Sequence, residues 1–365
     1  MSHIGVQNDP DQRSRERERP RSRSRARTIR RGILVGLLVL VLTGGGAAWW
    51  MYQGLDSNLK DGAVDLNKTL GDGKDRPART AAAAGATNLL VLGSDSRAGK
   101  NAALDPGSDV SGARSDTALL VHIAKGRTKA VAVSIPRDTL VTRPECTRSD
   151  GTVVPSRKRV MFNSVFSQVG LACTAKTVEA MSDVRVDHLI VLDFAGFKGL
   201  VDAVGGVTVT LDQPITPLGL TAGAHRLDGT QALKFVRTRY GYGDGSDLGR
   251  IGLQQQFMLA LLSEIKRQDL LGSPAKLYRI ADTLTASLTT DSDLASLTAL
   301  AKFGRSVQGI DPAAMETIML PVSYDKQDPN RVVAAEPQAA ALWKAIRTDS
   351  TIPESAKKSP AGGGS

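Results

Sequence analysis

The segment Thr117-Ala-Leu-Leu-Val-His-Ile-Ala-Lys-Gly-Arg-Thr-Lys-Ala-Val-Ala-Val-Ser-Ile135 contains two apolar runs around a polar turn. The runs 117–123 and 130–135 have the length and the β-branched content of buried strands, and 125–129 has the length of a hairpin turn. A third apolar run, 88–93, precedes them. The segment therefore predicts three strands that pair in antiparallel order at the middle of a β-sheet.

The rest of the central region alternates between strand and helix patterns. Apolar residues recur at helical spacing in 194–204, 251–265 and 292–307, while 207–211 and 317–322 are short apolar runs and 233–239 alternates with a period of two. These elements interleave without a regular βαβ repeat. The predicted fold is α/β (mixed α+β), with a central mixed β-sheet flanked by helices.

Composition narrows the classes of function. Aromatic residues make up 4% of the chain, which disfavours a stacking platform for single-stranded nucleic acid. Two cysteines and four histidines disfavour a zinc site. The chain has neither the nucleophile elbow of a serine hydrolase nor a phosphate-binding Gly-x-x-x-x-Gly-Lys loop.

The basic charge is concentrated in the N-terminal tail. Residues 1–31 contain ten arginines and four acidic residues, and so carry +6 of the net +10. Residues 32–52 follow without a charge and end in Trp49, Trp50 and Tyr52. As a helix, these 21 residues would span about 30 Å, the thickness of a bilayer core, with the aromatic residues at one interface.

This pattern predicts a membrane anchor. Residues 12–31 hold ten basic side chains, whereas 53–72 hold only Lys60 and Lys68, so the N-terminus is expected in the cytoplasm and the rest of the chain outside. A cleaved signal peptide is the alternative. The predicted organisation is a cytoplasmic arginine-rich disordered tail (1–31), a transmembrane signal-anchor helix (32–52), an extracytoplasmic spacer (53–86), a catalytic domain (87–349) and a disordered tail (350–365).

An oxidising compartment accounts for the two cysteines. A disulfide between Cys146 and Cys173 would stabilise the fold by about 3–4 kcal/mol in the chain-entropy model. Two buried free thiols are the alternative. We predict the disulfide, because both residues lie beyond the predicted anchor.

Charged residues flank the three central strands. Asp95 follows the first strand, Arg114 and Asp116 precede the second, and Arg137 follows the third. Antiparallel order places all of these positions at one edge of the sheet. Two carboxylates and two guanidinium groups are therefore expected to meet there.

A second set of polar residues lies downstream. Arg237 and Arg239 are two residues apart on the predicted strand 233–239, and Asp247, Arg250 and Gln254 have helical spacing. Arginine binds phosphate oxygens in a fork, and a pair of aspartates can hold Mg²⁺. A pyrophosphate or phosphodiester with a divalent cation would bind both the arginines and the aspartates. The spacing equally permits structural ion pairs between neighbouring Arg and Asp residues.

The motifs over residues 88–322 resemble those of the LytR-CpsA-Psr family of cell-wall glycopolymer ligases. The similarity follows a series of short motifs in order: Leu-Gly-Ser-Asp95-Ser-Arg, Arg114-Ser-Asp116-Thr, Ile-Pro-Arg137-Asp138, Phe162-Asn163-Ser164, Val186-Asp187-His188, Asp193-Phe194, Val201-Asp-Ala-Val-Gly205-Gly206, Leu227-Asp228-Gly229-x-Gln231, Val236-Arg237-x-Arg239 and Asp247-x-x-Arg250-x-x-x-Gln254. Residues 144–160 have the character of an insertion.

The resemblance implies a phosphotransferase that moves a glycopolymer from its undecaprenyl-pyrophosphate carrier to a muramic acid hydroxyl of peptidoglycan. It implies an apolar groove for the polyprenyl chain beside the site, with walls that include the helix 194–204. The polymer is left open among teichoic acid, capsule, arabinogalactan and the glycan of a glycoprotein.

The resemblance also implies residue roles. Asp95 and Asp116 would hold Mg²⁺, and the pyrophosphate would be bound by Arg114, Arg137, Arg237, Arg239, Arg250 and Gln254. Arg137, Arg239, Asp247 and Arg250 would be catalytic, with Asp247 either the base or the residue that fixes Arg250.

The expected location is the cell membrane, with a single pass, a cytoplasmic N-terminus and an extracytoplasmic catalytic domain. The expected partners are the lipid-linked glycopolymer, peptidoglycan and membrane lipid, without nucleic acid. The alternatives are a membrane-anchored transcriptional regulator or attenuator and a polyprenyl-pyrophosphate hydrolase. A regulator would need the arginine-rich tail to bind nucleic acid. Attraction to anionic membrane lipid explains the basic charge of the tail more simply.

Overall fold

The computed structural model describes residues 46, 49–50, 52–71, 76–94, 115–148, 150–238, 247–268, 280, 283–285 and 287–361. It divides into a unit of residues 1–54 and a larger unit of residues 55–365, which contains the sheets and the helices that cover them. In the described part of the chain, no helix is both long enough and apolar enough to cross a membrane. Most of the predicted anchor, 32–52, lies outside the described residues.

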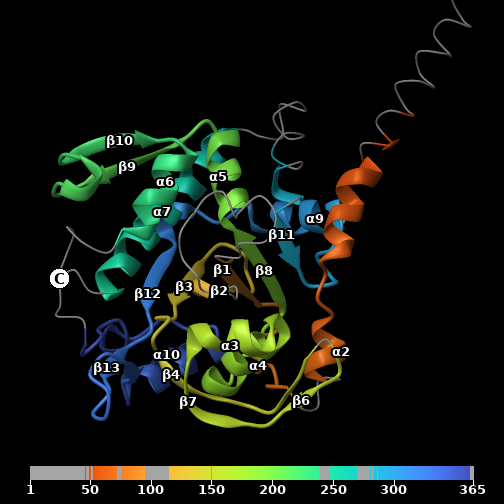
Figure 1. Cartoon of the computed structure of the whole chain (residues 1–365), viewed down its shortest axis with the longest axis vertical. Helices are drawn as coiled ribbons and strands as arrows, with labels where there is room; N and C mark the ends of the chain where they lie inside the picture. Colours follow the sequence, from red (N-terminus) through yellow and green to blue (C-terminus); the bar gives the residue numbers. More distant parts are fainter. Residues whose placement is uncertain are drawn as a thin grey trace, which may run out of the picture. The chain divides into compact units, whose positions relative to one another are not determined.

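A six-stranded mixed sheet forms the centre of the larger unit (Figure 1). Its order is β11-β8-β1-β2-β3-β12, where β1 is antiparallel to β2 and parallel to β8, and β3 is antiparallel to β2 and parallel to β12. The antiparallel order predicted for the three central strands is confirmed. The strand bounds are β1 (Thr87–Ser94), β2 (Ser115–Ile123), β3 (Ala130–Ser134), β8 (His188–Asp193), β11 (Leu288–Thr290) and β12 (Glu316–Met319).

One face of the sheet carries the main core. Its strand side chains, such as Leu90, Leu92 and Leu120, are completely buried because period-two alternation turns them towards the covering helices. The layer on this face is made by α2 (Leu66–Leu70), α3 (Phe162–Val169), α4 (Leu171–Ser182) and α10 (Gln338–Arg347).

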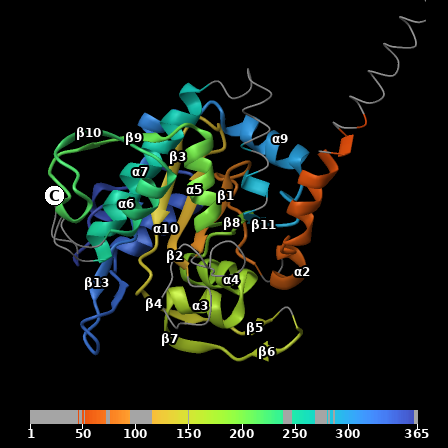
Figure 2. The ribbon, with the colours of Figure 1, turned by 45° about the horizontal axis from the view of Figure 1, so that its top comes forward.

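The second face is less completely covered. Val91, Leu119, Val121, Ile190 and Leu192 point to it and are only half-buried. Figures 1 and 2 show helices of this side grouped opposite α3 and α4. They are α5 (Phe194–Ala203), α6 (Gly229–Arg237), α7 (Asp247–Arg267) and α9 (Leu297–Val307), with the hairpin of β9 (Val207–Leu211) and β10 (Gly223–Leu227).

The insertion 144–160 takes part in two small ribbons. β4 (Leu140–Arg143) pairs with β7 (Arg157–Met161), and β5 (Cys146–Thr147) pairs with β6 (Val153–Val154) between them. Cys146 and Cys173 form the predicted disulfide, with 5.8 Å between their Cα atoms, and so join β5 to α4. The remaining ribbon is β13 (Val322–Tyr324) with β14 (Val332–Ala334).

Two predicted boundaries need correction. Residues expected in the spacer 53–86 belong to the fold, because Leu59, Leu66 and Leu70 are buried with the domain. The expected tail 350–365 is ordered as far as residue 361, where the backbone amide of Ala361 donates to Val322 at 2.9 Å. Both segments look polar and small-residue-rich in sequence, but a few spaced apolar side chains are enough to attach them.

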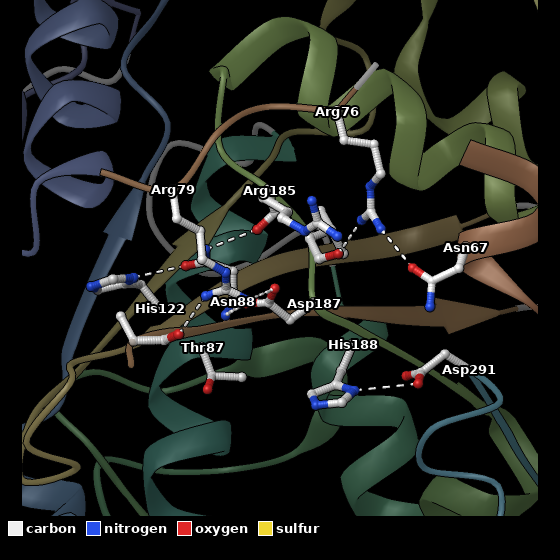
Figure 3. A network of polar contacts seen from close by, with 12 residues as sticks. Asn67, Arg76, Arg79, Thr87, Asn88, His122, Arg185, Asp187, His188 and Asp291 are labelled. Atoms are coloured by element: carbon white, nitrogen blue, oxygen red, sulfur yellow. Dashed lines mark hydrogen bonds and ion pairs between the residues drawn. The ribbon is translucent and has the colours of Figure 1, made fainter. Parts of the chain in front are cut away.

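A polar network ties the 67–88 segment to the sheet edge where β1 and β8 begin (Figure 3). Arg76 is buried and binds the Glu179 carboxylate, with 2.6 Å between Nη2 and Oε1. Arg79 pairs with Asp187, which also accepts from the Asn88 amide at 2.8 Å. The motif residue Asp187 therefore has a structural role, and burial raises the pKa of its carboxyl group.

His188 gives this edge a pH dependence. Burial lowers the pKa of His188, but the Asp291 carboxylate 3.3 Å from Nδ1 and the charges of nearby aspartates outweigh it, so the pKa lies above its ordinary value. The charged form is favoured in the fold, and its stabilisation is present below pH ~6.5 and lost as the pH rises through the folded pKa.

We therefore predict that the free energy of unfolding falls as the pH is raised above ~6.5, and that His188→Gln falls less steeply. Urea titrations of both proteins between pH 6 and pH 9 measure this difference. Identical slopes for the two proteins would contradict the role given to the His188–Asp291 pair.

Candidate active site at one edge of the sheet

Four strands end at one edge of the sheet, opposite the polar network. Because β1, β3, β8 and β12 run in the same direction, their last residues lie together along this edge. Ser94, the last residue of β1, pairs with Asp193 on one side and Ser115 on the other. The carboxyl ends of strands are a common place for ligand sites in open sheets.

The pairing of β1 with β2 is irregular at this edge. The register of β1 and β2 shifts between Gly93 and Ser94, so that Gly93 pairs with Thr117 and Ser94 with Ser115. Asp116 is the extra residue in this β-bulge, a device that often lies next to active sites. The side chain of Asp116, together with Asp95 and Arg114, lies outside the described residues.

Arg137 lies in the turn that follows β3 at this edge. Its carbonyl oxygen accepts a hydrogen bond from the Asn163 amide at 3.0 Å, and the Phe162 amide donates to Thr139 at 2.9 Å. The Phe162-Asn163-Ser164 motif, at the start of α3, therefore fixes the backbone of the Arg137 turn. The guanidinium Nε is 3.4 Å from Oδ2 of Asp138, and the side chain is 17% exposed.

The prediction of a strand over 233–239 is wrong, because residues 229–237 form helix α6. Asp228 caps the helix by accepting from the Gln231 amide at 2.8 Å, while Oε1 of Gln231 accepts from the Asp228 amide at 3.0 Å. Ala232, Leu233 and Phe235 are buried against the neighbouring helices. The Asp228-Gly-Thr-Gln231 capping box is a sequence pattern that predicts a helix start here, and it is stronger evidence than the short alternation.

Arg237 therefore reaches the site from the end of a helix, and not from a strand. Arg237 is the last residue of α6, and its guanidinium carbon lies 4.8 Å from the ring centre of Phe194, the first residue of α5. This is a cation–π contact. Phe194 follows Asp193 at the end of β8, so Arg237 is placed at the same edge of the sheet. Arg239 lies outside the described residues.

The approach of α6 to α5 depends on Gly229. A Cβ atom at this position would be 2.3 Å from the Lys198 carbonyl oxygen, so no side chain fits without a shift of the backbone. The Gly229 amide instead donates to Oδ1 of Asp202 at 2.7 Å. The motif glycine therefore allows the close helix packing that places Arg237.

Helix α7 joins these parts. Nε2 of Gln254 donates to the Val236 carbonyl at 3.1 Å, beside Arg237, and Nε2 of Gln255 donates to the Ser134 hydroxyl at 3.0 Å, at the end of β3. Arg250 is buried one turn before Gln254, with 4% of its surface exposed. Asp247 begins the helix, but its side chain lies outside the described residues.

The structure thus brings the elements that carry Arg137, Arg237, Arg250 and Gln254 to one edge of the sheet. The sequence had not pointed to Phe194 under Arg237 or to the link between Gln255 and Ser134. Several guanidinium groups beside a backbone edge can bind an oxyanion with more than one negative charge. Beside them, the second face of the sheet offers apolar side chains that are only half-buried.

Known proteins of one family are similar to this chain. The sequence model of the LytR_cpsA_psr family matches residues 54–348. The chain is 31% identical over 288 residues to the cell wall biosynthesis protein LcpA of Corynebacterium glutamicum, covering 72% of this chain and 54% of LcpA. It is 29% identical to the polyisoprenyl-teichoic acid–peptidoglycan teichoic acid transferase TagT of Bacillus subtilis, covering 76% of this chain and 83% of TagT.

A solved structure of TagT bound to LI-WTA has the same fold. Its TM-score is 0.58 at 23% sequence identity, and the match covers 78% of this chain and 98% of that one. The chain spans little more than half the length of LcpA.

Proposed function

Because the chain belongs to the LytR-CpsA-Psr family, we propose that it is a phosphotransferase that joins a glycopolymer to peptidoglycan. The polymer would leave its undecaprenyl-pyrophosphate carrier and form a phosphodiester with a muramic acid hydroxyl. The observation that carries this proposal is the convergence of arginine-bearing elements at one strand edge beside a half-buried apolar face. That combination suits a substrate with a diphosphate head and a long hydrocarbon chain.

The arginines supply electrostatic stabilisation. Arg137, Arg237 and Arg250, together with Arg114 and Arg239, would bind the pyrophosphate oxygens, and Gln254 holds α7 against the end of α6. As the acceptor hydroxyl forms its bond to phosphorus, the bond to the lipid phosphate breaks and negative charge grows on that leaving group. Guanidinium groups fixed beforehand by packing stabilise this charge without reorganisation. Asp247, one turn before Arg250, is proposed to accept the hydroxyl proton or to orient Arg250.

The carboxylates proposed for Mg²⁺ have the right donor chemistry. Asp95 comes directly after Ser94, and Asp116 directly after Ser115, and these two serines are paired across β1 and β2. Two carboxylates from adjacent strand ends suit a hard cation that also binds phosphate oxygens. Mg²⁺ held there would neutralise pyrophosphate charge. Among the described residues, no group of three or more acidic, histidine or cysteine side chains offers another metal site.

The lipid chain is proposed to lie on the second face of the sheet. Val91, Leu119 and Val121 are half-buried there, and Met258 and Leu262 of α7 face the same region. Part of the polyprenyl chain would lie against these apolar side chains. The basic tail and the apolar segment 32–52 would hold the protein in the cell membrane.

The test is transfer by the full-length protein in a lipid bilayer. With Mg²⁺, lipid-linked polymer and peptidoglycan, we expect polymer–peptidoglycan product together with undecaprenyl phosphate, and chelation should abolish both. Release of polymer phosphate in equal amounts with and without peptidoglycan would identify a hydrolase and overturn the proposal. Enzyme treated with chelator and then resupplied with Mg²⁺ is the control for irreversible loss of the fold.

A further inference from the structure

A cavity of about 330 Å³ lies on the side of the sheet covered by α3 and α4. It is formed by β4, β7, α3 and the chain between β13 and β14. Its lining is rich in arginine, with Arg157, Arg159 and Arg331 around Ser164, Gln168 and Asp328. Two of these arginines come from the insertion, for which the sequence suggested no role.

The side chain of Arg159, which lines this cavity, is fixed by an ion pair with Asp325. Its Nη1 and Nη2 donate to the two oxygens of Asp325 at 3.1 and 2.7 Å, and the Gln327 and Asp328 amides donate to the same carboxylate. The Arg159 hydrogen bonds lower the pKa of Asp325 to about 2. Arg159 also has a φ of 56°, a backbone conformation that persists only where its surroundings hold it.

Two arginines of the β4–β7 ribbon, Arg143 and Arg157, have no acidic partner among the described residues, whereas Arg159 pairs with Asp325. Arg143 and Arg157 are directly opposite each other in the strand register, a destabilising arrangement for like charges. Arg143 is buried and donates to the Pro155 carbonyl at 2.5 Å, while its Nε has no partner among the described residues. Burial, followed by the charges of Arg157 and Arg148, lowers the pKa of Arg143.

Arg157 is the member of this pair that faces the cavity. Within the described part of the chain, its guanidinium makes neither a hydrogen bond nor an ion pair. An anion bound in the cavity would therefore meet a group that is not already neutralised, and would relieve its repulsion with Arg143.

The cavity is joined to the candidate active site through one carboxylate. Nη1 of Arg331, in the cavity lining, is 3.6 Å from Oδ1 of Asp138, and Oδ2 of Asp138 is 3.4 Å from Nε of Arg137. Helix α3 makes a second connection, since Ser164 lines the cavity and Asn163 holds the Arg137 backbone.

We propose that this cavity is an acceptor subsite, in which Arg157 binds a peptide carboxylate of the peptidoglycan strand whose hydroxyl attacks the phosphorus. This inference rests on the proposed function. Attacking and leaving oxygens lie roughly in line across the phosphorus. With the lipid chain on the half-buried face beside α7, as proposed above, the lipid phosphate would leave towards that face. The acceptor would then approach from the other side, where the cavity lies.

The test compares Arg157→Glu with Lys158→Glu in the full-length protein. Lys158 is the next residue on β7, is also exposed and does not line the cavity, so the control makes the same charge change on the same strand. The acceptor is a soluble, uncrosslinked peptidoglycan strand, supplied with its peptide carboxylates free or amidated. We expect Arg157→Glu to raise the acceptor KM about tenfold or more, with the donor KM and kcat near wild type.

Two further outcomes are expected from the chemistry. Amidation should raise the acceptor KM of the wild-type protein, but change little in Arg157→Glu, because the pair of charges is already lost. Binding of the same strand without donor, measured by calorimetry, should weaken in parallel, with Arg157→Gln as the milder variant.

The proposal is overturned if the wild type transfers polymer and Arg157→Glu keeps the wild-type acceptor KM. It is also overturned if the donor KM rises instead, since the cavity would then bind the acidic polymer. Absence of transfer by the wild type would be a failure of the proposed function, and strand binding lost in Arg157→Glu would still support the subsite.

Discussion

Alanine at position 137 is expected to lower the rate of polymer transfer by at least about 100-fold. Arg137 follows β3 at the sheet edge, its backbone is fixed by α3, and its side chain is 17% exposed. A guanidinium placed in this way meets the charge that grows on the leaving phosphate, and alanine offers nothing in its place. Arg137→Lys should retain part of the activity, because lysine keeps the charge but loses the two-pronged geometry.

The control for this experiment is Arg305→Ala. Arg305 is an exposed arginine on α9, away from the sheet edge, and its loss should leave transfer unchanged. Arg239→Ala belongs in the same series, with an expected loss of similar size that rests on its sequence motif alone. Transfer at near wild-type rates in both Arg137→Ala and Arg239→Ala would disprove the assignment of the site.

Removing the disulfide is expected to destabilise the fold by about 3–4 kcal/mol. Cys146 and Cys173 are buried, and their bond closes a sequence separation of 27 residues. Without it, the unfolded chain gains freedom, and β5 is no longer joined to α4. The double variant Cys146→Ala/Cys173→Ala avoids a free thiol and should lower the urea midpoint, and m should rise because the unfolded chain is less compact.

Reductant provides the matching control. Added to the wild-type protein, it should reproduce the loss of stability, and added to the double variant it should change nothing. A double variant as stable as the oxidised wild type would mean that the bond lies in a part of the chain that does not unfold with the core.

The central strands were predictable because their apolar runs are short and bounded by polar turns. From them, antiparallel order alone places the end of β1 at Ser94, the start of β2 and the turn after β3 at one edge. The alternation in 233–239 is also compatible with a helix that is buried on more than one side, since Leu233 and Phe235 lie on different sides of α6 and both are buried. The cap at Asp228 decides between the two, and it lies outside the window in which the alternation was counted.

Other features depend on tertiary contacts that no local pattern contains. Arg237 stacks on Phe194 across more than forty residues of chain, and Arg331 reaches Asp138 across nearly two hundred. The buried pair of Arg76 and Glu179 likewise joins a segment that looks like a linker to a helix of the core. The fold brings these residues together from distant parts of the chain, so no local sequence pattern predicts their contacts.

Because Gly229 has no Cβ atom, α6 can pack closely enough on α5 to position Arg237. Even one methyl group there would wedge the two helices apart, and the guanidinium at the far end would move with them. A mutational survey scored only by activity would rank this glycine beside the arginines, although it has no functional group to offer.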